Sequence, residues 1–374
     1  MKKLLLSFFL FVIAISAKAQ GVDYYIEMGK DFVEKPKNID TNYVYQYPPR
    51  LSLALTGKIQ QVGFMAYSDF KLYDVVPGSS VSYLDEGMYK KIGLEASYGG
   101  MSLGFDVQVG VKSATKRRSL AFGIQNLKWG VRVRYFGIKN HIINNITIGN
   151  PGDDYYTNDI KKSSGLGNLR NLSIDGYWML NHRKFSYTAT NIMNVVQKHT
   201  AGSFMLGARF MWSDLDTKED LNGLFEAYSA IQFAIGGGYS ANIVLWDRDK
   251  VNHDDRTVRN LTFNITAMPV LSLVNYLQTK AYVSQELKKS DVWCYPTPNI
   301  MGSTALSLTW GRFYYTTQFY VNWFYFSSAG AVNKSNFDAQ NIHIEGYDDD
   351  VISDMNIYGL LYNWTLSAKL YYRF

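Results

Sequence analysis

Ten charged residues lie on the polar side of stretches in which apolar and polar residues alternate. Side chains point alternately to opposite faces of a β-strand, so these charges would share the interior of a barrel. Enclosed charges must pair with one another or meet water. The set indicates either a selective channel, with a slight anion preference because arginine and lysine predominate, or a wet, salt-bridged filling. The candidate lumen-lining residues are Lys91, Glu95, Asp106, Arg132, Arg134, Asp175, Lys184, Arg209, Lys369 and Arg373.

The histidines give weak support for catalysis. We expect none in the middle of a strand, and the sequence holds no Gly-x-Ser-x-Gly motif. One expected outer loop, 247–255, combines acids with His253 and is similar to the Asp and His–Asp arrangement of outer-membrane aspartyl-type proteases. We interpret it as a solvated charged loop and predict no catalytic residue, with a surface hydrolase using His253 as the alternative. The histidines are His141, His182, His199, His253 and His343.

Other reactive groups are also expected to be non-functional. Glu345 and the run Asp348 to Asp350 form an acidic outer loop without the spacing of a calcium-binding loop. The three glycines 236–238 precede no Gly-Lys-Ser/Thr, so they do not predict a phosphate site. The single cysteine, Cys294, is expected to be external and has no activating base beside it. We therefore predict neither a metal nor a cofactor.

Transmembrane strands would position these residues, and the C-terminal stretch from Tyr362 to Phe374 is the clearest strand. Alternate positions in it are apolar or aromatic, and the intervening positions are mostly polar. A terminal aromatic residue on such a strand resembles the C-terminal signal by which the outer-membrane assembly machinery recognises barrel proteins. The expected assembly signal comprises Tyr362, Trp364, Leu366, Leu370, Tyr372 and Phe374.

Alternation upstream predicts an all-β fold, a single closed antiparallel transmembrane β-barrel over 51–374 with short periplasmic turns and long outer loops. About 14 strands are expected by this pattern, with 12 or 16 as rivals. The count takes Phe185 to Ala189 as one strand and lets Pro269 divide 261–283 into two. The charge-free stretch 228–246 is a strand, because its glycines would cost a helix about 1 kcal/mol each.

Loop lengths assign the two ends of the barrel. With the C-terminus in the periplasm, the tight turns at Gly99, Asn126, Asn181 and Gly311 are expected at the periplasmic end. The segment 214–226 also falls inside, although it is long for a periplasmic turn. The long polar segments expected outside are 72–87, 139–169, 247–257, 286–302 and 327–353.

Composition and the N-terminus agree with an exported barrel. Residues 1–19 are predicted to be a secretory signal with a cleavage site after Ala19, and we expect 20–50 to be a periplasmic lead-in or plug. Aromatic residues are 16% of the chain, which suits two membrane interfaces, and the mean hydropathy of −0.16 excludes a helical membrane protein. The sequence contains no long basic run, so we expect no nucleic-acid partner. One cysteine excludes an intramolecular disulfide.

Four stretches resemble the family called domain of unknown function 4421: 40–53, 181–187, 201–207 and 236–239. The resemblance implies a secreted protein of Gram-negative bacteria and supplies no catalytic residues. We predict a cell outer-membrane barrel, in contact with lipid, lipopolysaccharide and the barrel assembly machinery, that passes or binds a small solute without enzymatic activity. The alternatives are the hydrolase above and an adhesin or partner-binding barrel. The oligomeric state stays open.

Overall fold

The computed structural model describes residues 39–72, 76–84, 88–110, 118–148, 157–192, 194–217, 227–248, 258–283, 286–327 and 352–374. The chain divides into two units, 1–39 and 40–374, and the fold below is that of the second. The expected signal segment lies outside the described residues, as does the lead-in up to residue 38. None of the helices in the described ranges is long and apolar enough to cross a membrane.

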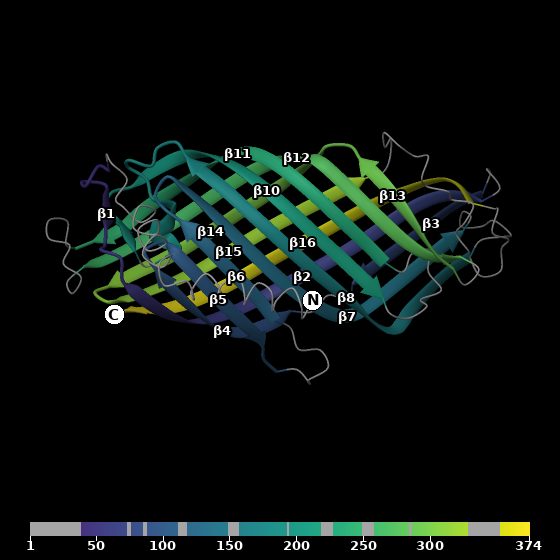
Figure 1. Ribbon diagram of the computed structural model, residues 1–374, viewed down its shortest axis with the longest axis horizontal. Coiled ribbons are helices and arrows are strands. Elements are labelled where there is room, and N and C mark those ends of the chain that lie inside the picture. The colour runs from purple at the N-terminus through teal and green to yellow at the C-terminus, as the bar shows by residue number, and fades with distance from the viewer. Residues whose placement is uncertain are drawn as a thin grey trace, which may run out of the picture. The chain divides into compact units, whose positions relative to one another are not determined.

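A closed antiparallel β-barrel forms this unit, and its wall is a ring of 12 strands. Each strand of the ring is hydrogen-bonded to two neighbours, and the last strand pairs with the first to close it (Figure 1). The all-β barrel is therefore confirmed, with the smaller of the strand numbers that the sequence allowed. The ring strands are β2 (Leu51–Leu72), β4 (Tyr89–Tyr98), β5 (Met101–Gln108), β6 (Arg118–Gln125), β7 (Trp129–Ile148), β8 (Thr157–Met179), β10 (Ala201–Thr217), β11 (Ala227–Asp247), β12 (Arg259–Val283), β14 (Thr297–Trp310), β15 (Phe313–Ser327) and β16 (Ile352–Arg373).

Two further strands, β3 (Val76–Leu84) and β13 (Glu286–Cys294), extend the wall at the end away from the C-terminus (Figure 1). Both occupy segments that the sequence predicted as loops, 72–87 and 286–302. The segment 139–169 is likewise mostly strand, because β7 continues to Ile148 and β8 begins at Thr157. Polar composition marked these segments as loops, but hydrogen-bonded ladders extend well past the apolar stretches.

The count of 14 was wrong for two physical reasons. Residues Phe185 to Ala189 alternate like a strand, but the chain there enters the barrel interior and forms the short 3-10 helix η2 (Tyr187–Thr190). Residues 261–283 were expected to break at Pro269, but they form the single strand β12. Two strands fewer leave the number even, so both ends of the ring still lie at the same rim.

Proline is accommodated inside β12 by a local gap in its ladder with β11. The paired residues skip from Gly236↔Val270 to Tyr239↔Ala267, so the missing N–H of Pro269 breaks no bond there. Gly236 lies against the Pro269 carbonyl, and a β-carbon there would approach that oxygen to 2.2 Å. Glycine thus permits close contact where the sequence predicted a bend, and the stretch is a strand as expected.

Because residues 261–283 form one strand and not two, two connections belong to the opposite end of the barrel from the one predicted. Val258 accepts a hydrogen bond from the backbone of Gly311, so β12 starts at the rim that carries the C-terminus. The segment 249–257 with His253 therefore begins and ends at this rim, not at the opposite end as predicted. The segment 218–226 joins strand ends at the far end, which removes the one poor fit of the loop lengths. Both segments themselves lie outside the described residues.

Three of the four tight turns predicted at this rim join neighbouring strands, whereas the turn at Asn181 leads into the barrel interior. Gly99 and Gly100 have φ of 61° and 121°, and Gly311 has φ of 58°, a region that glycine enters readily. Asn126 closes its turn by accepting hydrogen bonds from the backbone of Lys128 and Trp129. These turns keep the rim compact, so that the connection between β8 and β10 is the longest one described there.

Burial in the barrel is the reverse of that in a water-soluble protein. Large apolar side chains face outward, and Leu94, Phe204 and Leu206 are 68%, 66% and 56% exposed. Charged side chains face inward, and Lys91 and Arg209 are each only 3% exposed. In the expected assembly signal, Leu366 and Leu370 of β16 and Phe374 just after it face outward and are 40%, 50% and 55% exposed.

Candidate functional site

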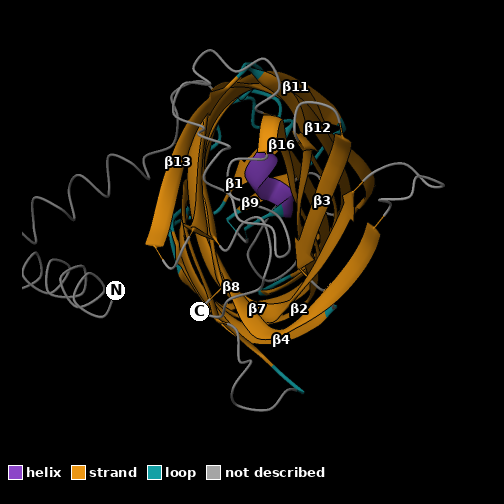
Figure 2. Ribbon diagram, turned by 90° about the vertical axis from the view of Figure 1, so that its right-hand side faces the viewer, coloured by secondary structure: helices purple, strands orange, loops and turns teal. Residues whose placement is uncertain are grey.

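The connection between β8 and β10 folds into the barrel and fills it at the rim. We call its residues 185–192 and 194–197 the rim segment; it includes η2 and the short strand β9 (Val195–Gln197). Viewed along the barrel, η2 and β9 lie within the ring of strands (Figure 2). Phe185, Thr188 and Gln197 are completely buried. The rim end of the lumen is therefore occupied by the chain's own residues.

Neutral hydrogen bonds hold the rim segment to the wall. Gln197 accepts from the backbone N–H of Ser186 at 3.0 Å, and its amide donates to the carbonyl oxygens of Lys184 and His199. Asn260 on β12 donates to the Gln197 carbonyl oxygen at 2.9 Å. On β15, Tyr314, Thr316 and Gln318 donate to the carbonyl oxygens of Ala189 and Thr190. Buried backbone groups of the segment thus find partners without a charged side chain.

The N-terminal part of the unit adds a second layer to the rim. β1 (Val44–Gln46) pairs with β9 in a two-stranded antiparallel sheet. Arg373, one of the ten lumen candidates, lies here: its guanidinium stacks on Tyr47 at 3.4 Å and donates to the Gly311 carbonyl oxygen. Lys184 is exposed in the turn before the rim segment, because the strand expected at 185–189 does not form. Neither residue lines the central cavity.

Deeper in the barrel, three arginines surround one carboxylate. Asp175 on β8 forms ion pairs with Arg134 on β7 and with Arg209 on β10, the latter at 2.7 Å between Oδ1 and Nε. Tyr320 on β15 lies across the lumen, and its hydroxyl accepts from Arg134 at 2.6 Å. Arg132 is directly opposite Asp175 in the β7–β8 register. This cluster joins β7, β8 and β10 through charged side chains and reaches β15 through the Tyr320 hydroxyl.

Two further carboxylates each have one close lysine partner. Asp106 lies 2.6 Å from Lys58 and also accepts from the hydroxyls of Thr56 and Ser119. Glu95 lies 2.8 Å from Lys369 and accepts from the Tyr371 hydroxyl at 2.7 Å. Such pairs satisfy buried acids, although pairing alone adds little to stability. Lys91 donates to Gln60 at 2.7 Å.

A cavity of about 160 Å³ separates these ion pairs from the rim segment. Its lining includes Glu95, Asp106, Arg132, Arg134, Arg209 and Lys369, as well as Tyr187 and Ile192 of the rim segment. We call the ion pairs and the charged lining of this cavity the charged region. Eight of the ten predicted residues lie in it, and the other two, Lys184 and Arg373, lie at the rim.

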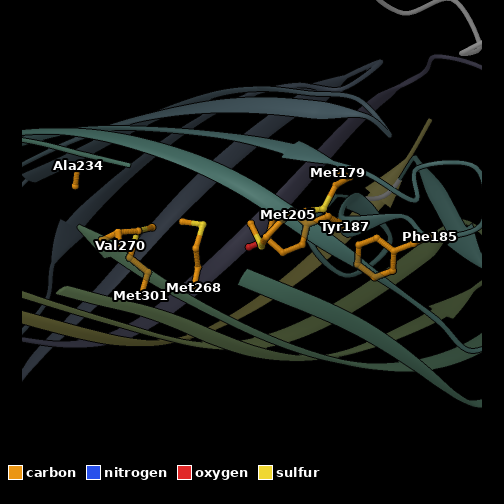
Figure 3. Packing of buried hydrophobic residues seen from close by; sticks show 8 residues of the cluster. All are labelled: Met179, Phe185, Tyr187, Met205, Ala234, Met268, Val270 and Met301. Atoms are coloured by element: carbon orange, nitrogen blue, oxygen red, sulfur yellow. The ribbon is translucent and has the colours of Figure 1, made fainter. Parts of the chain in front are cut away.

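One wall of the interior is apolar. Methionines from β8, β10, β12 and β14 form a row with Phe185 and Tyr187 of the rim segment (Figure 3). A smaller pocket of about 50 Å³ lies between this row and Arg132. The cluster comprises Met179, Phe185, Tyr187, Met205, Ala234, Met268, Val270 and Met301.

Sequence reasoning missed several residues of the site. Lys58, Tyr320 and Tyr371 lie on strands that were expected, and each belongs to the inward set of its strand. Parity would have included Lys58, whereas tyrosines occur on both faces and give no such signal. The rim segment carried no signal at all, because its alternation matched that of a spanning strand.

The remaining candidate groups do not converge. His141 lies within β7, contrary to expectation, and His182 and His199 lie at the rim, where burial and then Lys128 and Arg183 lower the pKa of His182. Cys294 ends β13 and is buried. His253, His343 and the acidic residues 345–350 lie outside the described residues. Within the described ranges, no group of three or more His, Cys, Asp or Glu side chains could hold a metal ion.

Comparison with known proteins matches residues 38–347 to the family model "Domain of unknown function (DUF4421)". No curated protein matches the sequence.

Three solved structures are similar in fold. The translocator domain of the autotransporter NalP from Neisseria meningitidis aligns at 12% identity and a TM-score of 0.34, covering 95% of this chain and 98% of that one. The outer membrane protease OmpT from Escherichia coli aligns at 8% identity and a TM-score of 0.35, covering 86% of this chain and 97% of that one. The Pseudomonas putida toluene transporter TodX aligns at 8% identity and a TM-score of 0.25, covering 84% of this chain and 89% of that one. At these scores the likeness assigns no activity.

Proposed function

This chain belongs to the DUF4421 family, and from that premise we propose that it is an integral outer-membrane β-barrel that binds a small solute inside and does not pass it freely. The family carries no assigned chemistry, so support comes from the geometry. The observation that carries the membrane location is the inverted burial: an apolar outer face surrounds a charged interior. A continuous apolar surface of this kind is unfavourable in water.

Exposed aromatic residues indicate the depth of the membrane. Phe313, Trp310 and Phe374 lie near the rim, and Trp323 and Tyr325 lie further along β15, all on the outward face. The ten residue-to-residue steps from Phe313 to Trp323 rise roughly 34 Å along the strand, or roughly 25 Å along the axis at the usual tilt. That height matches the apolar band of outer-membrane barrels. The strands beyond Trp323 would project from the outer surface.

Cell fractionation tests the location. We expect the protein in the outer membrane, with the electrophoretic shift on heating that folded barrels show. Phe374→Ser should reduce the heat-modifiable form, since the terminal aromatic would then no longer be presented to the assembly machinery. Recovery of the wild-type protein in the soluble periplasm would overturn the proposal.

Binding is favoured over free passage because the rim segment fills the lumen. Planar-bilayer recording tests this: we expect no steady conductance from the wild-type barrel. A variant in which 185–197 is replaced by a short Gly-Ser turn should conduct, provided that it keeps heat modifiability. Steady open-channel current from the wild-type barrel would favour passage instead.

An enzyme is less well supported. The described residues on either side of the segment that holds His253, Arg248 and Val258, lie at the rim with the C-terminus, which we assign to the periplasm, whereas a surface hydrolase would use the opposite end. We expect no hydrolysis of peptide or lipid ester substrates by the purified barrel. Turnover that disappears in His253→Ala would support the hydrolase.

A further inference from the structure

The charged region of the interior has more positive than negative groups. In the part that the structure describes between the rim segment and the outer end, six cations face three carboxylates. Lys91 has several partners of its own; without it, five cations for three carboxylates still leave a surplus of two positive charges, which is unfavourable in a largely enclosed space unless water or an anion offsets it. The cations are Lys58, Lys91, Arg132, Arg134, Arg209 and Lys369, and the carboxylates are Glu95, Asp106 and Asp175.

Arg132 contributes most clearly to this surplus. Asp175 is its cross-strand neighbour, but the two oxygens of Asp175 are already engaged by Arg134 and Arg209. No residue in the described ranges forms a hydrogen bond or ion pair with the Arg132 side chain. A guanidinium group does not lose its proton in a protein, so Arg132 cannot relieve the surplus by titration. Its donors are available to a ligand.

Arg132 also lies where the two hollow spaces meet. It lines both the cavity of about 160 Å³ and the pocket of about 50 Å³. Met205, Met268 and Met301 line the smaller pocket, and Tyr187 of the rim segment borders both spaces. Methionine side chains adapt readily to apolar groups of different shape. A charged donor therefore adjoins an apolar recess.

We propose that this junction binds a small organic anion, with a carboxylate on Arg132 and a short alkyl tail in the methionine pocket. The proposal rests on the solute-binding function proposed above and names the chemical class of the solute. A carboxylate matches the planar guanidinium donors in a bidentate geometry. Because the recess is small, only a short tail would fit.

Isothermal titration of the barrel in neutral detergent tests the proposal with butanoate, acetate, butanamide and inorganic phosphate as probes. Butanoate should bind about tenfold more tightly than acetate, since two additional methylene groups become buried. It should also bind at least about tenfold more tightly than butanamide, which cannot accept charge-assisted bonds at both atoms. These comparisons use only the wild-type barrel.

Two variants separate charge from fold. Arg132→Gln should weaken butanoate about tenfold or more and weaken butanamide much less. Lys90→Gln removes a positive charge from the exposed outward face of β4 and should leave butanoate binding unchanged. Both variants should keep heat modifiability, which verifies the fold.

Several results would overturn the inference. Equal affinity for butanoate and butanamide would show that the site selects no anion, while solute binding itself would stand. If phosphate or acetate bound as tightly as butanoate, the site would not recognise an alkyl tail, and that part of the proposal would be wrong. If no probe binds to the folded barrel, this ligand class is wrong, whereas the location and the closed rim remain separately decided by fractionation and conductance.

Discussion

Two polar layers of the barrel interior are built differently. At the rim, neutral amides and hydroxyls hold the rim segment, and Gln197 alone bonds to Ser186, Lys184 and His199. In the charged region, cations outnumber carboxylates, and Arg132 forms no hydrogen bond or ion pair with the described residues. A neutral network that is satisfied internally specifies a structure, whereas surplus charge needs something from outside the protein. The difference separates the part that closes the barrel from the part that binds.

Asp175→Asn should give the largest effect. It removes the shared carboxylate and leaves Arg134 and Arg209 without an acidic partner, so we expect a loss of about 3–5 kcal/mol in the free energy of unfolding. Urea unfolding in lipid vesicles measures it, and added phosphate should restore part of the loss. Asp216→Asn, on the outward side of β10, is the control and should change stability by no more than about 0.5 kcal/mol. Equal losses would contradict the charged cluster.

Gln197→Ala should destabilise the rim segment locally. The buried Ser186 N–H and the part-buried carbonyl oxygens of Lys184 and His199 would lose their partner, at a cost of about 2 kcal/mol. Amide hydrogen exchange in the rim segment should then accelerate roughly thirtyfold. Amides of the β14–β15 ladder in the same variant provide the control and should keep their rates. Uniform acceleration throughout the barrel would mean that the rim does not open separately.

Two buried tyrosines permit a matched comparison of the layers. Tyr314 and Tyr371 are register partners, with ring centroids 5.6 Å apart. Tyr371 donates to the Glu95 carboxylate and Tyr314 to the Ala189 carbonyl oxygen. Tyr371→Phe should cost about 1.5–3 kcal/mol, and Tyr314→Phe about 1 kcal/mol, in the same urea experiment. If Tyr314→Phe lowers the free energy of unfolding as much as Tyr371→Phe does, the neutral and the charged layer do not differ in the strength of their hydrogen bonds.

Lys184→Gln should have the smallest effect. The side chain is exposed at the rim and belongs to neither layer. We expect a change within about 0.5 kcal/mol in stability and no change in butanoate affinity. Reduced butanoate affinity measured by titration would place Lys184 in the site after all.

Alternation in the sequence predicted the wall well but could not separate the wall from its contents. Phe185 and Ala189 alternate with polar residues whether they span the membrane or pack inside the ring. Pro269 predicted a break because a proline lacks its N–H, but the gap opposite Gly237 and Gly238 removes that cost. Both errors arise from tertiary context, which a local pattern does not contain.

The candidate site shows the same limit. Parity placed Asp175 and Arg209 in the interior, because inward charge is easily recognised against apolar neighbours. It could not show that two arginines share one carboxylate while Arg132 lies beside it without an ion pair, since partners come from strands far apart in the chain. The sequence also did not predict the methionine row, because Met205 and Met268 look like ordinary apolar residues in their strands.

The rim segment is attached to β8 and β10 at its two ends, so its departure from the lumen is a unimolecular equilibrium. Its open fraction does not depend on protein concentration and changes tenfold for each 1.4 kcal/mol of contact energy. A segment held by about 4 kcal/mol would be open roughly one thousandth of the time. Hydrogen bonds from Tyr314, Thr316 and Gln318 would thereby set the rate at which a bound solute leaves through the rim, while Arg132 sets how tightly it is held.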